Sequence, residues 1–194
     1  MSKWKRPIVL ASASPRRAAL LAEYEDGIEV FPPTLDDGEF ACGSIPAKIW
    51  VRALAVMKAQ NVFENCAFEK GTILAADTVC VIDDEIVGQP ATALDATRMI
   101  EAMVSKTHEV FTGWCLLSLE DDVTLVGHEV ASLEFGPISK EVIRKYIATG
   151  SWQGKAGGYN LSERLEAKWP IVCFGDPTSV MGLPMEKLSK ELVK

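Results

Sequence analysis

Apolar residues fall into short runs along this chain, and the spacing within the runs predicts strands that alternate with helices. The longest run covers residues 71–82 and holds a single charged residue, Asp77. Continuous apolar sequence of this kind is typical of a strand that is buried on both faces of a sheet. The other runs predict strands at residues 7–10, 28–31, 85–87, 108–117, 123–135 and 169–174.

Helices are predicted where apolar side chains recur every three or four positions. They fall at residues 18–24, 45–63, 93–104, 140–149 and 185–193. In the second of these, Ile49, Ala53, Val56 and Ala59 or Gln60 fall near the spacing of one helical face. Asp83 and Asp84 favour a hairpin turn between two strands. The mixture of strand–helix units and long hairpins predicts an α/β fold, in which helices flank a mixed sheet.

The junction of the first strand and the first helix combines several polar side chains. Ser14 is suited to cap the helix, and Pro15 to occupy its first position, where the missing N–H is not needed. Arg16 and Arg17 then lie in the first turn, where the helix dipole disfavours positive charge unless an anion binds there as well. Forked arginine donors and the hydroxyls of Ser12 and Ser14 match phosphate oxygens. The alternative is an ordinary capped helix with two solvated arginines.

Asp77 is a second candidate for a functional residue. A carboxylate in an apolar strand is costly to desolvate unless it is paired or binds a metal. We therefore expect Asp77 to lie where the strand breaks and a site opens. The alternative is an aspartate that makes local backbone hydrogen bonds at a bend. Lys58, in the helix predicted at 45–63, is a further candidate, and its alternative is a lysine on an exposed helix face.

The composition limits the class of protein. The chain has 194 residues, of which 48% are hydrophobic and 24% charged, as expected of a globular protein with a sizeable core. The net charge of -7 argues against nonspecific binding of nucleic acid. No apolar run approaches the ~20 residues of a membrane helix. The apolar stretch near the N-terminus is also too short for a signal peptide.

The cysteines favour a reducing compartment. Their number is five, which is odd, and none are spaced as CxxC, so a disulfide framework and a zinc site are both disfavoured. Cys80, Cys115 and Cys173 lie in apolar runs, and we expect them to be buried. The cytoplasm is the expected location.

Seven segments of the chain form an ordered series, at residues 10–17, 36–37, 54–59, 76–79, 105–113, 155–159 and 180–184. Together they resemble the Maf family of nucleotide pyrophosphatases, which is related to the inosine-triphosphatase superfamily. Any one segment is a weak signal, because short motifs recur by chance. Seven in the family's order, over nearly the whole chain, are a strong one.

The resemblance implies an α/β fold with an elongated, twisted, mixed sheet flanked by helices around a central cleft. It implies a single domain over residues 1–194 with two lobes, and a homodimer. The implied activity is metal-dependent hydrolysis of a nucleoside triphosphate, with a pyrimidine or modified base, to the monophosphate and pyrophosphate. This is a house-cleaning activity. Mg²⁺ or Mn²⁺ is the implied metal, because hard oxygen ligands suit these ions.

The resemblance also assigns residues to the substrate. Ser12, Ser14, Arg16 and Arg17 are expected to hold the triphosphate at the start of the first helix. Lys58 is expected to neutralise the same charge from the second helix. Arg17 and Lys58 are further expected to act in catalysis, because cleavage of a triphosphate needs cations around its oxygens.

Asp37 and Asp77 are expected to bind the divalent metal or position the attacking water, with Asp77 as the general base. Three positions depart from the family pattern. Gln89 stands where a lysine is common, Ser162 where a glutamine is frequent, and Asp37 where glutamate is common. We expect Gln89 and Ser162 to contact the substrate nevertheless. A lost charge-assisted contact costs on the order of 1.5–3 kcal/mol, so these changes predict slower turnover or an unusual nucleotide.

Two other functions compete with this one. The first is a nucleotide-binding regulatory protein with little turnover, since the family is linked by name to septum formation and cell division. The second is a nonspecific phosphatase, which releases orthophosphate first. Neither His108 nor His128 is expected to be catalytic, and His108 is interpreted as structural. Trp152 and Trp169 are expected to cap a core rather than stack on a base.

Overall fold

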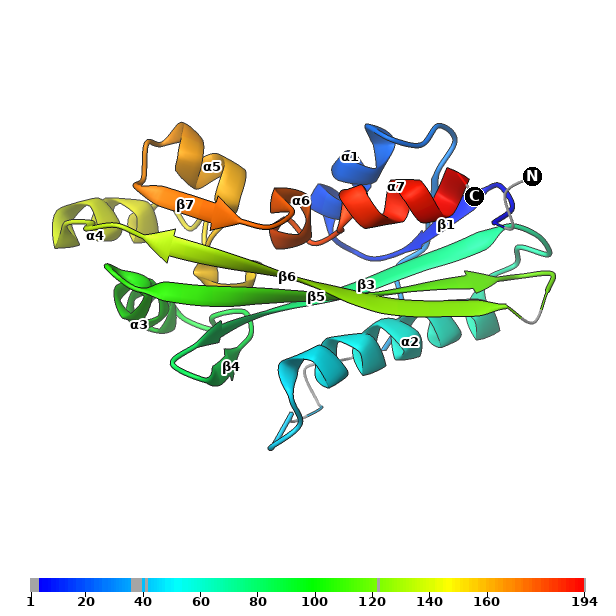
Figure 1. Ribbon diagram of the computed structural model, residues 1–194, viewed down its shortest axis with the longest axis horizontal. Coiled ribbons are helices and arrows are strands. Elements are labelled where there is room, and N and C mark those ends of the chain that lie inside the picture. The colour runs from blue at the N-terminus through cyan, green and yellow to red at the C-terminus, as the bar shows by residue number, and fades with distance from the viewer. Residues whose placement is uncertain (1–3, 36–39, 41, 122, 194) are drawn as a thin grey trace.

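The framework of the protein is one mixed sheet, seen in a computed structural model that describes residues 4–35, 40, 42–121 and 123–193 (Figure 1). The strand order is β2–β1–β3–β5–β6–β7, and β4 pairs with β3. β1 runs parallel to β2 and β3, and the other pairs are antiparallel. The strands are β1 (Ile8–Ala11), β2 (Glu29–Val30), β3 (Thr72–Ile82), β4 (Glu85–Val87), β5 (Thr107–Ser118), β6 (Thr124–Phe135) and β7 (Ile171–Phe174).

Helices flank this sheet, with α2 on one face and α1, α6 and α7 on the other (Figure 1). The α/β fold predicted from the sequence is therefore confirmed. All five predicted helices are present, whereas three short segments, η2, α5 and α6, were missed because each is too short to show a period. The helices are α1 (Pro15–Ala22), α2 (Ala47–Asn65), α3 (Ala93–Met103), α4 (Lys140–Ala148), η2 (Ala156–Gly158), α5 (Leu161–Glu166), α6 (Pro177–Val180) and α7 (Met185–Val193).

β3 is the strand beside which the site lies. It pairs with β5 along nearly its whole length, with Asp77 opposite Gly113. On its other edge, β1 pairs with residues 72–75 and β4 with residues 80–82. Among the described residues no strand pairs with the edge at 76–79. The prediction that the strand breaks at Asp77 is wrong, because β3 continues through it. The opening lies beside the strand instead, where the short β1 has ended.

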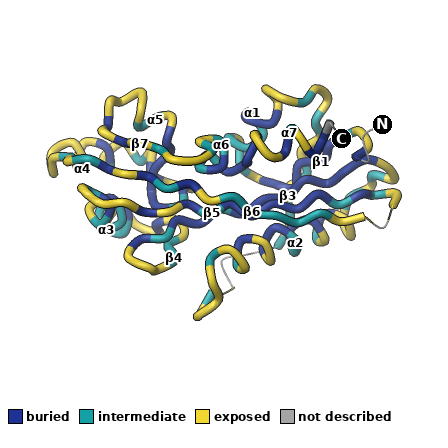
Figure 2. The backbone as a smooth tube through the Cα atoms, in the orientation of Figure 1, coloured by how far each residue is buried: buried dark blue, intermediate teal, exposed yellow. Residues whose placement is uncertain are grey.

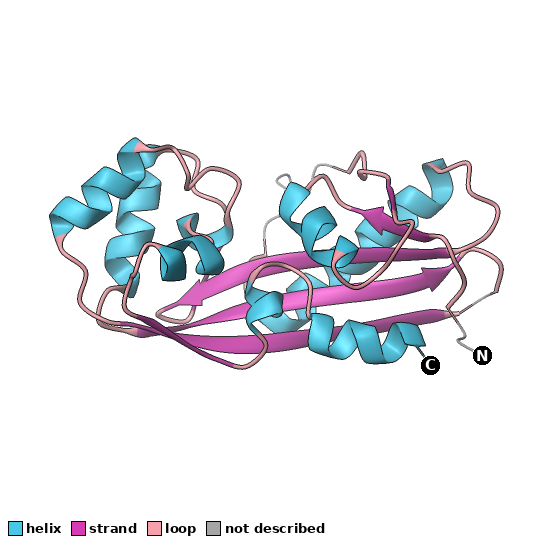
Figure 3. Cartoon of the chain, turned by 90° about the horizontal axis from the view of Figure 1, so that it is seen from above, coloured by secondary structure: helices cyan, strands magenta, loops and turns pink. Residues whose placement is uncertain are grey.

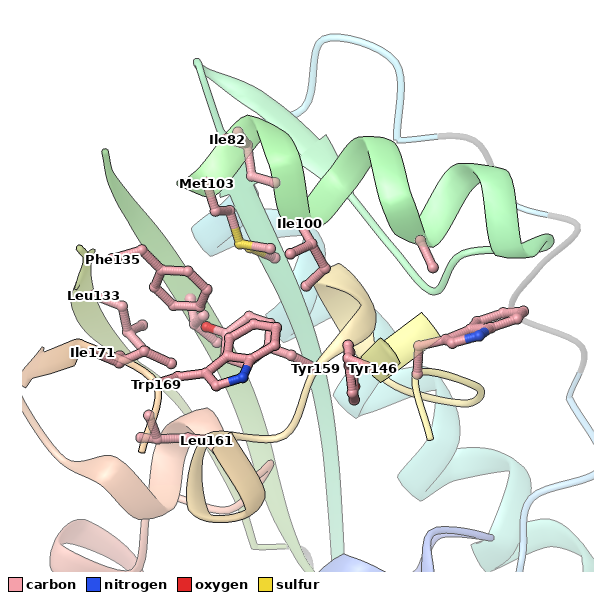
Figure 4. Close-up of a cluster of buried hydrophobic side chains, with 14 of the residues drawn as sticks. Ile82, Ile100, Met103, Leu133, Phe135, Tyr146, Tyr159, Leu161, Trp169 and Ile171 are labelled. Atoms are coloured by element: carbon pink, nitrogen blue, oxygen red, sulfur yellow. The ribbon is translucent and has the colours of Figure 1, made fainter. Parts of the chain in front are cut away.

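Apolar cores lie at both ends of the sheet. Figure 2 shows that the long strands are largely buried between them. At one end α3, α4 and α5 enclose an aromatic core, in which Phe135, Tyr146, Tyr159 and Trp169 meet edge to face (Figure 4). Trp152 is buried in the same core, so the prediction that the two tryptophans cap a core is confirmed. At the other end α1 and α7 cover one face and α2 the other. Figure 3 shows the two groups of helices joined by the long strands.

α2 buries a lysine together with its apolar face. The predicted face is correct only in part: Ile49 is 50% exposed and Ala53 is also exposed, whereas Ala59 is buried. Apolar side chains surround most of this helix, so spacing alone does not single out one side. Lys58 belongs to the buried face, and the alternative of a solvated lysine is excluded. The buried residues are Val51, Leu54, Ala55, Lys58, Ala59 and Val62.

α2 approaches β5 closely at Gly113. A Cβ atom at this position would lie 2.3 Å from the carbonyl carbon and oxygen of Val51, and 2.6 Å from the backbone nitrogen of Arg52. These are backbone atoms, which cannot turn aside as a side chain can. The glycine therefore lets α2 lie against the sheet opposite Asp77.

Gly113→Ala is expected to lower the free energy of unfolding by about 3 kcal/mol, because helix and strand must separate to admit the methyl group. Urea denaturation of the purified variant measures this change. Gly88→Ala is the matched control, since a Cβ atom there meets nothing within 4 Å. Superimposable unfolding curves for the two variants would contradict the close approach of α2.

Two further sequence predictions can be compared with the fold. None of the described helices combines the length and the apolar character that crossing a membrane requires. Cys80 and Cys115 are buried as predicted. Cys173 is only partly buried, and the prediction for it was wrong, because β7 lies at the edge of the sheet.

Candidate functional site

A polar cleft follows the open edge of β3, in the central position expected from the sequence. Three adjoining cavities form it, and Gln89 lines all three. One cavity, of about 470 Å³, is lined by both Arg17 and Lys58. A neighbouring cavity is lined by Asp77 and Thr78. Successive strand residues point to opposite faces of a sheet, so groups from both faces of β3 meet at this open edge.

The start of α1 forms one wall of the cleft. The Oγ atom of Ser14 accepts a hydrogen bond from the backbone N–H of Arg17 at 3.4 Å, so the predicted cap is confirmed. Pro15 occupies the first turn, also as predicted. The Oγ atom of Ser12 accepts from the backbone N–H of Ser14 at 3.1 Å. Both serines line the cleft, so the positive end of the helix dipole faces it.

Arg17 is held from two other elements. Its Nε atom donates to the carbonyl oxygen of Gly182 at 2.9 Å, and its Nη2 atom donates to Oγ1 of Thr78 at 3.1 Å. Its Nη1 atom lies 3.5 Å from Oγ of Ser12. A Cβ atom on Gly182 would come within 2.8 Å of the Arg17 Nε atom, so this close approach requires a glycine. The guanidinium is therefore positioned at the cleft rather than solvated.

Arg16 reaches across the cleft. Its Nη2 atom donates to the carbonyl oxygen of Gly154 at 2.6 Å, and both residues line two of the cavities. The contact joins α1 to the loop that precedes η2. This hydrogen bond is exposed, so an anion that enters the cleft competes for the same donor.

Lys58 and Asp77 form a buried ion pair. The Nζ atom of Lys58 lies 2.6 Å from Oδ1 of Asp77, and their side chains are 11% and 10% exposed. A carboxylate in an apolar strand is costly to bury unless it is paired, and Lys58 provides the partner. The structure also excludes the alternative of an aspartate at a bend, since Asp77 lies within regular strand pairing. Lys58 thus connects Asp77 to the cavity that Arg17 lines.

Comparison with known proteins identifies the family. The profile of the family described as Maf-like protein matches residues 7–194. The chain belongs to the Maf family. The dTTP/UTP pyrophosphatase of Ruminiclostridium cellulolyticum is 38% identical to it, with 97% of this chain and 96% of that protein covered. The dTTP/UTP pyrophosphatase of Bacillus cytotoxicus is also 38% identical, with 96% and 94% covered.

Solved structures were compared as well. The nucleoside-triphosphatase / dITP/XTP pyrophosphatase from Mycobacterium abscessus superposes with a TM-score of 0.44 at 14% identity. The superposition covers 68% of this chain and 73% of that one. Membership of the Maf family does not depend on this distant likeness, because the family profile and the sequence relatives establish it.

The cleft brings together most of the residues that the Maf resemblance assigns, but not all. Ser162 is exposed on α5, where its Oγ atom donates to Oδ1 of Asn160 at 2.7 Å, and it is absent from the cleft lining among the described residues. Asp37 lies outside the described residues. The residues that the cleft does unite are Ser12, Ser14, Arg16, Arg17, Lys58, Asp77 and Gln89.

Sequence reasoning missed several residues of this Maf site. Lys155 lines the cleft, and its buried Nζ atom lies 2.7 Å from Oε1 of Glu163. Thr78 and Gly182 both hold Arg17. The position of Lys155 at the start of a glycine-rich segment was an available signal. Thr78 and Gly182 lie in the Maf-like segments 76–79 and 180–184, but no local pattern shows that they contact Arg17, because each lies far along the chain from it.

The side chains that line the cleft show how a divalent metal ion could be bound. Within the described part of the chain, no three His, Cys, Asp or Glu side chains are grouped so as to hold an ion. In that part, Asp77 is the one acidic residue that lines the cleft. Mg²⁺ is usually held by one or two carboxylates together with substrate phosphates. Asp77 therefore fits an ion that enters with the triphosphate, rather than one bound by the protein alone.

The two histidines lie outside the site chemistry. His108 is buried, and its Nε2 atom lies 2.8 Å from the hydroxyl oxygen of Tyr159. Burial lowers the pKa of His108 to about 4, so the ring is neutral at pH 7. His128 lies on β6 and lines a different cavity. The burial and the hydrogen bond of His108 agree with its predicted structural role.

His108→Gln is expected to remove part of the dependence of stability on pH. The pKa of His108 is about 4 in the folded protein against 6.5 in the unfolded chain, so the unfolded state binds the proton first. Stability therefore falls as the pH falls from 6.5 towards 4, by about 3 kcal/mol for this group. Urea denaturation at several pH values measures the difference. Parallel pH profiles for the variant and the wild type would contradict it.

Proposed function

We propose that this chain hydrolyses a pyrimidine nucleoside triphosphate, such as dTTP or UTP, to the nucleoside monophosphate and pyrophosphate. One water is consumed and the bond between the α- and β-phosphates is broken. The observation that carries the proposal is the shared cleft, in which Arg17 and Lys58 line one cavity and Lys58 holds Asp77. The names of the Maf relatives from Ruminiclostridium and Bacillus support both the reaction and the base.

The start of α1 binds the phosphates in this proposal. Its dipole and its first-turn N–H groups favour an anion at the mouth of the helix. Ser12 and Ser14 add hydroxyls, and Arg16 and Arg17 add forked donors that match phosphate oxygens. The positive charge in the first helical turn is then balanced by the ligand.

Asp77 acts as the general base. It takes a proton from the water that attacks the α-phosphorus, in line with the leaving pyrophosphate. Lys58 lies between the carboxylate and the phosphate cavity, and there it stabilises charge that develops on the phosphate oxygens. Asp77 would hold Mg²⁺ or Mn²⁺ together with the substrate phosphates, and the ion would supply further neutralisation of that charge.

A product assay tests the proposal. The purified protein is incubated with a panel of purine and pyrimidine triphosphates and Mg²⁺ or Mn²⁺, and the products are separated by ion chromatography. We expect pyrophosphate and monophosphate, most rapidly from dTTP or UTP, and no reaction after chelation of the metal. Release of orthophosphate first, or no pyrophosphate from any nucleotide, would overturn the proposal.

Gln89 favours a second candidate, a nucleotide-binding regulatory protein with weak turnover. The residue lines all three cavities, where a lysine would add a positive charge beside the phosphates. Tight, metal-dependent binding of dTTP without hydrolysis would support this candidate over the first.

Gln89→Lys is expected to raise kcat/KM by about tenfold, because one charge-assisted contact to phosphate is gained. Steady-state kinetics with dTTP measures the change. Gln60→Lys is the control, because that residue is exposed on α2 and does not line any of the three cavities. Equal kinetics for the Gln89 variant and the wild type would show that the missing lysine does not limit turnover.

A further inference from the structure

A chain of hydrogen bonds runs from Arg17 into the buried centre of the sheet. The Nη2 atom of Arg17 donates to Oγ1 of Thr78 on β3. This oxygen lies 2.9 Å from Oγ1 of Thr112 on β5. Thr112 in turn donates to the carbonyl oxygen of Ser179 on α6 at 2.7 Å. Thr112 and Ser179 are fully buried, so water does not compete for these bonds.

The number of hydroxyl protons determines which group donates in each of these hydrogen bonds. Each threonine hydroxyl has one proton to donate. The proton of Thr112 goes to Ser179, so the contact between the two threonines is donated by Thr78. The Thr78 oxygen is then left as an acceptor for the Arg17 guanidinium. All donors point the same way, from the arginine to the buried carbonyl.

The loop after α6 closes the arrangement. α6 itself supplies Ser179 at the end of the hydroxyl chain, and the loop supplies Gly182, whose carbonyl oxygen accepts directly from Arg17. Asp176 fixes this loop, since its carboxylate accepts from the backbone N–H of Thr178 at 2.8 Å and of Glu186 at 3.1 Å. The acceptors around Arg17 are thus set before any ligand arrives.

We propose that Thr112 is a positioning residue for the triphosphate reaction, acting through Thr78 on Arg17. Thr112 is absent from the described lining of the cleft, so its hydroxyl acts through Thr78 rather than on the substrate itself. Arginine loses considerable side-chain freedom when it is held in one position, and Arg17 also opposes the helix dipole. Thr112 fixes the acceptor that keeps the guanidinium turned to the cleft. The inference rests on the proposed function.

The test compares Thr112→Val with Thr112→Ser. Valine keeps the shape and removes the hydroxyl, so we expect KM for dTTP and Kd for its α,β-imido analogue to rise about tenfold, with a smaller change in kcat. Serine keeps the donor, and we expect it to restore both values to within about threefold. Thr72→Val is the control, because Thr72 is equally buried on β3 and donates to the carbonyl oxygen of Lys5, away from the cleft.

A double-mutant cycle separates positioning from general weakening of the fold. If Thr112 acts through Arg17, then Thr112→Val raises Kd for α,β-imido-dTTP by less than about twofold in an Arg17→Ala background. The same tenfold rise in both backgrounds, or no rise in either, would overturn the inference. Thr78→Val, which removes the acceptor itself, repeats the test should the first variant not fold.

These outcomes are distinct from failure of the proposed function. If the wild type neither binds the analogue nor hydrolyses any triphosphate, the proposed function fails and the inference falls with it. If the wild type hydrolyses dTTP and Thr112→Val leaves KM and Kd unchanged, only the inference fails.

Discussion

Asp77→Asn is expected to lower kcat by about 10²–10⁴-fold while nucleotide binding remains, because the amide cannot accept the proton of the attacking water. The side chain keeps its size and its place on β3, so the cleft keeps its shape. Lys58 loses its buried anion partner, which lowers stability in the free protein. Binding of α,β-imido-dTTP by calorimetry and turnover of dTTP, measured on the same preparation, distinguish the two effects.

Asp83→Asn is the matched control for this experiment. Asp83 also pairs with a lysine, Lys106 at 2.7 Å, but the pair is exposed on the β3–β4 hairpin. We expect its kinetics to equal those of the wild type, since an exposed pair of this kind contributes little. An unchanged rate for Asp77→Asn would remove this residue from the mechanism, whatever the control shows.

Arg17→Ala is expected to raise KM for dTTP by about 10–100-fold, because two forked, charge-assisted contacts to phosphate are lost from a prepared position. Arg17→Lys is expected to recover only part of this, since an ammonium group lacks the planar fork. Arg98→Ala, on the exposed face of α3, is the control for loss of one positive charge. Thermal unfolding of each variant accompanies the kinetics, because Arg17 also ties α1 to Gly182 and Thr78.

A KM for Arg17→Ala equal to that of the Arg98 control would contradict the assignment of the phosphates to the start of α1. It would also leave the hydrogen-bond chain through Thr112 without a function in catalysis. A lower kcat with an unchanged KM would instead assign Arg17 to the transition state alone.

The elements that local chemistry determines were predictable from the sequence. Ser14 and Pro15 mark the start of α1, and both have the predicted roles. Asp83 and Asp84 form the predicted turn, with φ values of 48° and 66° that aspartate tolerates. A carboxylate alone in an apolar strand predicted a partner for Asp77, and Lys58 is that partner.

The remaining features depend on contacts between distant parts of the chain. α2 is apolar on several sides, so only its packing against β3 and β5 selects the face that carries Lys58. The opening beside Asp77 results from the ends of β1 and β4, which the sequence of β3 does not contain. Gly182 contacts Arg17 from 165 residues away. No local pattern records such a pairing.

Four expectations from the sequence remain predictions. These are the homodimer, the cytoplasmic location, the divalent metal and the role of Asp37. Equilibrium sedimentation of the purified protein, with and without dTTP, tests the dimer, and a mass of 21.2 kDa throughout would contradict it.

The central claim is that one cleft joins the start of α1 to Asp77 around a triphosphate. A crystal structure of the protein with α,β-imido-dTTP and Mg²⁺ tests it most directly. We predict the β- and γ-phosphates against Ser14 and Arg17, and the α-phosphorus on the side of Lys58 and Asp77. A complex in which the phosphates lie elsewhere, with Arg17 still bound only to Gly182 and Thr78, would contradict the account.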